Sequence, residues 1–316
     1  MCRPFPRLRI VVALLIAYIA ESQTTDSIFL RGQLEINGDT ASLTVDSDHS
    51  NFRITNPEAV RAEKNRQVVL HAISTKDEIR VISSASIDDQ NKPDDFSFAA
   101  IVAERKDSAM VEHLLQLGAN PNAKTQDGTP ALVAAMSMGD HTLMPVTGFH
   151  PDVEITTLLL DHGANPDALN KNWQTPLMAA ACFGDEKLVK LFIDHKANVN
   201  VGNRFGMTAL MYARSFAKVK MLIAAGASVN DKNITGETAL YYFAQRADPD
   251  AVKALIEAGA NVNAKNDKNM SPLHLAQLEL AADRSSSKQS RGPEHEKQVQ
   301  SVIDLLVAAG ALPETQ

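Results

Sequence analysis

The spacing of two markers in residues 96–312 constrains the fold more than any other feature of the sequence. A glycine followed by alanine recurs at positions 118, 163, 226, 259 and 310, and lysine replaces the glycine at position 196. The leucines at 132, 177, 210, 240 and 273 each lie 14 residues after such a position. An interval that never changes indicates a structural segment of fixed length, so this part of the chain consists of copies of one unit.

The complete unit resembles the ankyrin repeat. From each leucine to the next marked position the intervals are 31, 19, 16, 19 and 37 residues, so the regular unit is 33 residues long. The family's pattern is matched by Thr175-Pro176-Leu177, by Ser271-Pro272-Leu273-His274, and by the Ala-Asn-Val-Asn runs at Ala197 and Ala260. The resemblance covers residues 96–312, about six repeats with an opening copy near Ala99, and implies an α-helical solenoid.

Local chemistry agrees with short paired helices. Thr175 can cap a helix, and Pro176 fits its first turn because a missing N–H costs nothing there. Gly163 and Gly226 are expected to end the second helix of a repeat in a left-handed conformation. Lys196 occupies that glycine position, which predicts a cost of about 1 kcal/mol.

Three copies depart from the regular length, each between the two helices of a repeat. A three-residue deletion near Ser215 and Phe216 predicts a tighter turn. The insertion within 283–298 is polar and rich in Lys, Arg and Ser, which favours a flexible loop. The insertion within 139–153 carries apolar residues, Phe149 among them, and either packs locally or contacts a partner.

Residues 24–90 show the alternation of polar and apolar residues that is typical of β-strands. Asn37-Gly38 predicts a hairpin turn, and residues 57–65 predict a short helical turn. Strands are expected over 28–36, 41–45, 52–54, 68–72 and 79–87. This order resembles the small OB-type β-barrel, with Gly32 placed where the first strand bends.

The first 22 residues predict a signal peptide. Three arginines and no acid precede an unbroken apolar run over 10–20, and small residues lead to the expected cleavage after Ser22. Because eleven helical residues span only about half of a bilayer core, an uncleaved anchor is the less favoured alternative. Cleavage leaves a chain of net charge −9 with Cys182 as its single cysteine, so we expect a periplasmic or secreted protein with no membrane span.

The fold class predicted from these segments is α+β and multidomain. A signal peptide over 1–22 precedes an OB-like β-barrel domain over 24–90 and a linker over 91–95. An α-helical ankyrin-repeat domain of about six repeats follows over 96–316. A chain of 316 residues has room for two such domains.

Composition and motifs argue against several classes of function. A net charge of −7 provides no broad basic surface for nucleic acid, and two cysteines cannot form a disulfide scaffold or a four-cysteine zinc site. His162 and His195 are 33 residues apart at equivalent repeat positions, so they do not readily share a metal. The sequence has no Gly-x-Ser-x-Gly, His-Glu-x-x-His or Gly-rich phosphate loop. We therefore expect no enzymatic activity, no cofactor and no metal.

The resemblance also predicts where a partner binds. In ankyrin stacks the hairpin tips and the first-helix face line a concave surface that binds proteins, and Trp173 lies at a tip where the pattern has glycine. The predicted protein-binding residues are Trp173, Phe205, Arg204, Lys171, Tyr212, Tyr241 and Phe149. Two alternatives stay open: that Trp173 folds back over the hairpin base, and that the tyrosines belong to the core.

The sequence thus predicts a non-enzymatic module that binds another protein in the periplasm or outside the cell. Resemblance to exported bacterial ankyrin-repeat proteins implies an immunity or inhibitor role against a toxin or hydrolase, and the acidic net charge suits a basic partner. One alternative is an envelope protein that binds a small molecule or glycan through the barrel, and another is a secreted ankyrin effector.

Overall fold

The computed structural model describes most of the chain between residues 27 and 313. The described ranges are 27–37, 40–45, 51–57, 60, 67–75, 78–86, 95–105, 107–136, 151–285 and 292–313. The predicted signal peptide, its cleavage site after Ser22 and most of the linker predicted over 91–95 lie outside these ranges. Among the described residues no helix combines the length and apolar character needed to cross a membrane.

The N-terminal part is a closed five-stranded β-barrel. Its strands follow the order β1-β2-β3-β5-β4 around the barrel, and β1 closes it by pairing with both β2 and β4. All neighbours are antiparallel except β3 and β5, which run parallel. The strands are β1 (Ser27–Asn37), β2 (Thr40–Val45), β3 (Asn51–Ile54), β4 (Gln67–Thr75) and β5 (Glu78–Ser86). The strand positions expected from alternation are confirmed, and Asn37 pairs with Thr40 across the expected hairpin turn.

Gly32 is the residue at which β1 changes partners. It pairs with Val45 of β2 and with Val68 of β4, so its backbone lies between two neighbouring strands. A Cβ atom built on Gly32 lies only 2.0 Å from the carbonyl oxygen of Thr44. Only glycine allows this close approach of the two strands.

Apolar side chains of alternate strand positions fill the barrel. Leu34, Leu43, Val68 and Leu70 are fully buried in one core cluster, and Val60 from the connection between β3 and β4 closes it. The alternating polar residues face outward, as Thr40, Ser42 and Thr44 do in β2. This core cluster consists of residues from the strands and from the connection between β3 and β4.

Successive helix pairs follow the barrel. In each described pair we call the first helix the inner helix and the second the outer helix. The chain divides into two compact units. One unit contains the barrel, α2 (Asp95–Ala100) with a π-helical turn η2 (Ile101–Arg105), α3 (Ser108–Gln116), α4 (Ala131–Ala135) and α5 (Val153–Asp161). In this unit α4 packs against α5, and α3 packs against α5.

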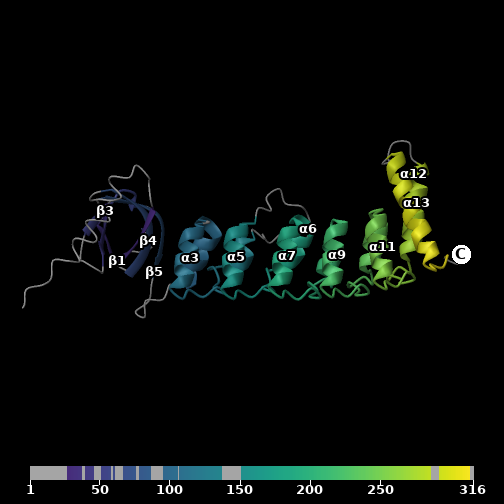
Figure 1. Cartoon of the computed structure of the whole chain (residues 1–316), viewed down its shortest axis with the longest axis horizontal. Helices are drawn as coiled ribbons and strands as arrows, with labels where there is room; N and C mark the ends of the chain where they lie inside the picture. The colour runs from purple at the N-terminus through teal and green to yellow at the C-terminus, as the bar shows by residue number, and fades with distance from the viewer. Residues whose placement is uncertain are drawn as a thin grey trace, which may run out of the picture. The chain divides into compact units, whose positions relative to one another are not determined.

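The second unit stacks its helices in chain order. The inner helices are α6 (Pro176–Phe183), α8 (Ala209–Tyr212), α10 (Ala239–Gln245) and α12 (Pro272–Ser285). The outer helices are α7 (Glu186–Asp194), α9 (Phe216–Ala224), α11 (Pro249–Glu257) and α13 (Pro293–Ala308). Figure 1 shows the outer helices side by side, and each helix contacts its equivalent in the next pair. Stacking therefore buries the faces that a single pair leaves open.

Side-chain caps begin many of these helices. Thr175 caps α6 as predicted, with its hydroxyl accepting the Met178 N–H at 3.3 Å. Asp185, Asp152 and Asp248 accept the equivalent N–H at the start of α7, α5 and α11. Because these donors have no partner inside the helix, each cap removes an unsatisfied N–H.

The irregular copies differ in helix length. The deletion near Ser215 shortens the inner helix, because α8 ends at Tyr212 and α9 begins at Phe216. The flexible loop predicted within 283–298 is wrong at both of its ends, since α12 extends to Ser285 and α13 begins at Pro293, and residues 286–291 lie outside the described ranges. Asp283 accepts a hydrogen bond from His295 Nδ1 at 2.6 Å, which ties the two long helices together. The insertion within 139–153, including Phe149, lies almost entirely outside the described residues.

Candidate protein-binding surface

The hairpins that connect successive repeats share one asparagine-based turn. Asn170, Asn203, Asn233 and Asn266 occupy the same place in four of them. In each, the side-chain oxygen accepts the N–H groups two and four residues later, at 2.9–3.1 Å. The asparagine thus satisfies the backbone of a tight loop and presents the residues after it at the tip.

Three successive hairpins, those of Phe205, Ile234 and Asp267, are joined by backbone hydrogen bonds. The Ile234 N–H donates to the carbonyl of Phe205 at 2.9 Å, and the Asp267 N–H donates to the carbonyl of Thr235 at 3.0 Å. Gly206 has φ +71°, and a Cβ atom there would lie 3.0 Å from the Cα of Asn233. Glycine at the tip therefore permits both the left-handed turn and the close approach of the next hairpin.

Trp173 occupies the same tip position without glycine's freedom. Its φ is +63°, in the left-handed region, and its side chain is 60% exposed. The alternative in which the indole folds back over the hairpin base is therefore wrong. A left-handed conformation costs an L-residue about 1 kcal/mol, and here most of the residue's surface stays exposed, so burial offsets little of this cost.

The next two tips carry further large side chains. The Arg204 guanidinium carbon lies 4.7 Å from the ring centre of Phe205, which is half-buried. Ile234, on the following tip, is 62% exposed. Sequence reasoning did not select Ile234, although its position after the hairpin asparagine matches that of Arg204. We call Trp173, Arg204, Phe205 and Ile234 the hairpin edge.

The tyrosines chosen from the sequence lie behind this edge. Tyr241 is 8% exposed and belongs to the core, which is the alternative that the sequence left open for the tyrosines. Tyr212 is half-buried and its hydroxyl oxygen accepts the Asn203 side-chain N–H at 3.1 Å. Tyr212 therefore supports a hairpin and offers only part of its ring to a partner. Lys171 is exposed on the hairpin of Trp173, and Phe149 lies outside the described residues.

Tyr242 forms the equivalent support one repeat later. Its hydroxyl donates to Glu237 Oε2 at 2.6 Å and accepts from Asn233 Nδ2 at 2.8 Å. Burial raises the pKa of Tyr242, and the hydrogen bond to Glu237 raises it further. Burial also raises the pKa of Glu237, but hydrogen bonds from Tyr242 and Asn233 outweigh this and lower it overall. This network holds the Glu237 carboxylate and the Tyr242 hydroxyl in fixed positions behind the hairpin edge.

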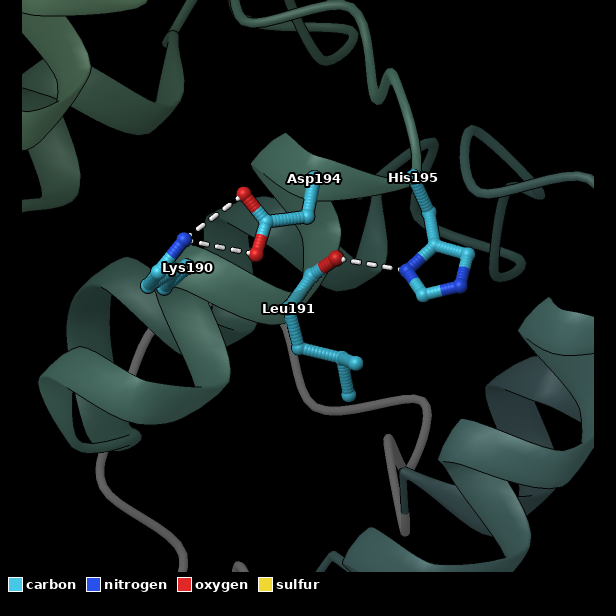
Figure 2. A network of polar contacts seen from close by, with 4 residues as sticks. All are labelled: Lys190, Leu191, Asp194 and His195. Atoms are coloured by element: carbon cyan, nitrogen blue, oxygen red, sulfur yellow. Dashed lines mark hydrogen bonds and ion pairs between the residues drawn. The ribbon is translucent and has the colours of Figure 1, made fainter.

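The repeat histidines have local structural partners. His195 Nδ1 donates to the carbonyl of Leu191 at 2.9 Å at the end of α7, next to the Lys190–Asp194 ion pair (Figure 2). His162 makes the same bond to Leu158 at 2.8 Å. Lys196 follows with φ +63°, so a lysine adopts the left-handed conformation that glycine has in the other copies. No group of three metal-binding side chains occurs within the described ranges.

Comparison with known proteins identifies the helical part. Residues 146–233 and 214–282 match the family model for ankyrin repeats (3 copies). A crystal structure of an ankyrin repeat domain from Acinetobacter baumannii is similar, with a TM-score of 0.56 and 24% identity, over 69% of this chain and 100% of that one. No curated protein sequence matches the chain significantly. Residues 146–282 therefore contain ankyrin repeats, a scaffold that generally binds other proteins rather than performing catalysis.

Proposed function

We propose that this protein is a non-enzymatic binding module whose hairpin edge contacts a partner protein. The observation that carries the proposal is Trp173, a large aromatic residue that is 60% exposed in a left-handed conformation where glycine is favoured. A residue that opposes local stability and buries little surface is best explained by an intermolecular contact. Tryptophan and arginine also dominate the energetics of protein interfaces.

The geometry of the hairpin edge supports one continuous contact. Hydrogen bonds between neighbouring hairpins hold the tips of Phe205, Ile234 and Asp267 in fixed succession. Arg204 lies over the ring of Phe205, so its guanidinium is partly ordered before a partner arrives. An ordered edge loses less conformational entropy on binding than separate loops do.

We further propose that the partner is a toxin or hydrolase that this protein neutralises in the periplasm or outside the cell. The basic and apolar start of the sequence supports export, and the acidic net charge of −7 supports steering toward a basic partner. Blocking an enzyme by stoichiometric binding requires only a preformed surface, which the repeats provide.

We infer that the barrel is of the OB type and that the six described helix pairs are six ankyrin repeats. The closed strand order β1-β2-β3-β5-β4, the parallel β3–β5 pair and the close strand approach at Gly32 support the first inference. The pairs from α2–α3 to α12–α13 support the second. On the same grounds we propose the division into a barrel over 24–90, a linker over 91–95 and repeats over 96–316, with α2 beginning at the last linker residue, Asp95.

Purification of the exported protein with its bound partner tests the proposed function. The double variant Trp173→Gly, Phe205→Ala should release the partner. The control Phe216→Ala, which removes a 40% exposed ring elsewhere in the second unit, should not. Trp173→Gly should also leave the fold intact, because glycine suits φ +63°. Retention of the partner by the double variant would overturn the assignment of the hairpin edge. If barrel variants alone released it, the barrel would be the binding domain.

A further inference from the structure

Two arginines meet at the ends of the inner helices, away from the hairpin edge. Arg246 ends α10, and Arg214 follows α8 in the preceding repeat. Each inner helix begins at a hairpin and runs toward the turn that leads to its outer helix. The two arginines therefore lie at the helix-turn side of the repeats, whereas Trp173 and Phe205 lie at the hairpins.

Arg246 is held by the helix of the neighbouring repeat. Its Nη1 donates to the carbonyl of Ala213 at 2.7 Å and its Nη2 donates to the carbonyl of Met211 at 3.5 Å. Its guanidinium carbon lies 5.4 Å from the ring centre of Phe243, which is 1% exposed. The carbonyls at the end of α8 and the ring below fix the position of this cation.

Arg214 is fixed at one side and open at the other. Its Nε donates to Cys182 Sγ at 3.2 Å, and its guanidinium carbon lies 5.9 Å from the ring centre of Phe183. In the part of the chain that the structure describes, its two terminal nitrogens have no hydrogen-bond partner. Phe183 itself is 41% exposed, so an apolar ring borders the open donors.

The two cations lie close enough to repel each other. Burial lowers the pKa of Arg246, and the charge of Arg214 lowers it further. Neither arginine forms an ion pair with a carboxylate among the described residues. A bound anion would relieve this repulsion.

The nearby acidic side chains already have other partners. Asp185 and Asp248 accept the first N–H groups of α7 and α11, and Glu186 accepts the Ser215 hydroxyl at 3.1 Å. Asp185 and Glu186 also face Lys218, whose Nζ donates to the carbonyl of Ala181 at 3.0 Å. The charge of Lys218 is thus matched locally, and Arg246 has Asp248 nearby, whereas Arg214 pairs with no carboxylate among the described residues.

We propose that Arg214, Arg246 and Phe183 form a second binding site, which accepts a carboxylate flanked by an apolar side chain in a partner polypeptide. The free edge of the Arg214 guanidinium presents two parallel donors, the geometry that binds a carboxylate in a bidentate manner. Phe183 provides the adjoining apolar contact. An Asp or Glu next to Leu or Phe in an extended segment has this chemistry.

Peptide titration of the full chain tests this site. The probes are an acetylated Leu-Glu-Leu-Glu peptide, its Leu-Gln-Leu-Gln counterpart and inorganic phosphate. Binding of each probe is monitored by the NMR signals of labelled arginine Nε–H groups. The glutamate peptide should shift the Arg214 signal saturably, and the glutamine peptide should not. Absence of a saturable shift up to about 10 mM peptide, or an equal shift with phosphate alone, overturns the proposal.

Matched variants distinguish a specific site from general charge attraction. Arg214→Gln should weaken binding of the glutamate peptide at least about tenfold, and Arg214→Lys should weaken it less. Lys220→Gln removes the same charge from an exposed lysine that lies 5.5 Å from the Phe216 ring centre, and it should leave binding unchanged. Equal weakening by Lys220→Gln contradicts the site. Trp173→Gly should not alter the titration, so this proposal and that of the hairpin edge fail independently.

Discussion

His71 Nδ1 donates to Asp107 Oδ2 at 2.6 Å, and this bond joins the barrel to the first outer helix. The two side chains are 7% and 8% exposed, and Asp107 Oδ1 also accepts the Met110 N–H at 3.1 Å as the cap of α3. Phe29 of β1 stacks between the rings of His71 and His113, with ring centres 4.7 and 4.3 Å apart. One carboxylate thus begins a helix and holds a strand of the barrel against it.

Asp107→Ala is expected to destabilise the protein by about 3 kcal/mol. It removes a helix cap, worth about 1 kcal/mol, and leaves the buried His71 without its acceptor, which costs about 2 kcal/mol more. Chemical unfolding followed by circular dichroism measures the change. Asp152→Ala is the matched control, since Asp152 caps α5 through the Ile155 N–H. Equal losses in the two variants would show that the bond to His71 adds no stability.

The stack at His113 is expected to weaken in mild acid. Burial lowers the pKa of His113 from its usual 6.5, and the nearby charge of His71 lowers it further. Since the pKa of His113 is higher in the unfolded chain, the unfolded chain binds the proton more readily. The free energy of unfolding therefore falls as the pH decreases below about 6.5. The unfolding free energy of the wild type should therefore fall more between pH 7.5 and 5.5 than that of His113→Phe. Identical pH dependence of both proteins would contradict this role.

Lys196→Gly is expected to stabilise the second unit by about 1 kcal/mol, because φ +63° suits glycine. Gly226→Lys makes the reverse change at the equivalent position, where φ is +89° and a Cβ atom meets nothing within 4 Å. It should destabilise by a similar amount through the backbone alone. Thermal unfolding of both variants measures the two effects, and changes of the same sign would refute the explanation.

Gly32→Ala is expected to destabilise the barrel by about 3 kcal/mol. The new methyl group must displace the Thr44 carbonyl, which lies 2.0 Å from the Cβ position, so β2 would have to move. Gly202→Ala provides the control, because its Cβ atom comes no closer than 3.4 Å to Gly206. Unfolding that is monitored through barrel signals should separate the two variants clearly, and similar stabilities would argue against the close approach.

Much of the architecture was predictable because it depends on short-range regularities. The 14-residue interval from each marked position to the following leucine, the Thr175 cap and the strand alternation act through neighbouring residues, and all three predicted the elements that form. The α12–α13 pair was predicted less well, because a polar insertion was expected to be a loop. A buried bond between Asp283 and His295 stabilises the longer helices instead, and no local pattern reveals that partnership.

The candidate sites show the same division. The sequence alone placed Trp173 and Phe205 at hairpin tips, since their distance from the repeat markers determines their register. Only the tertiary structure decided that the indole is 60% exposed while Tyr241 is buried, because packing against neighbouring repeats determines exposure. It also decided that Arg214 meets Cys182 and that His71 meets Asp107, pairs 32 and 36 residues apart in the chain. Periodicity specifies a repeat, whereas contacts between distant residues depend on how the repeats and the barrel pack together.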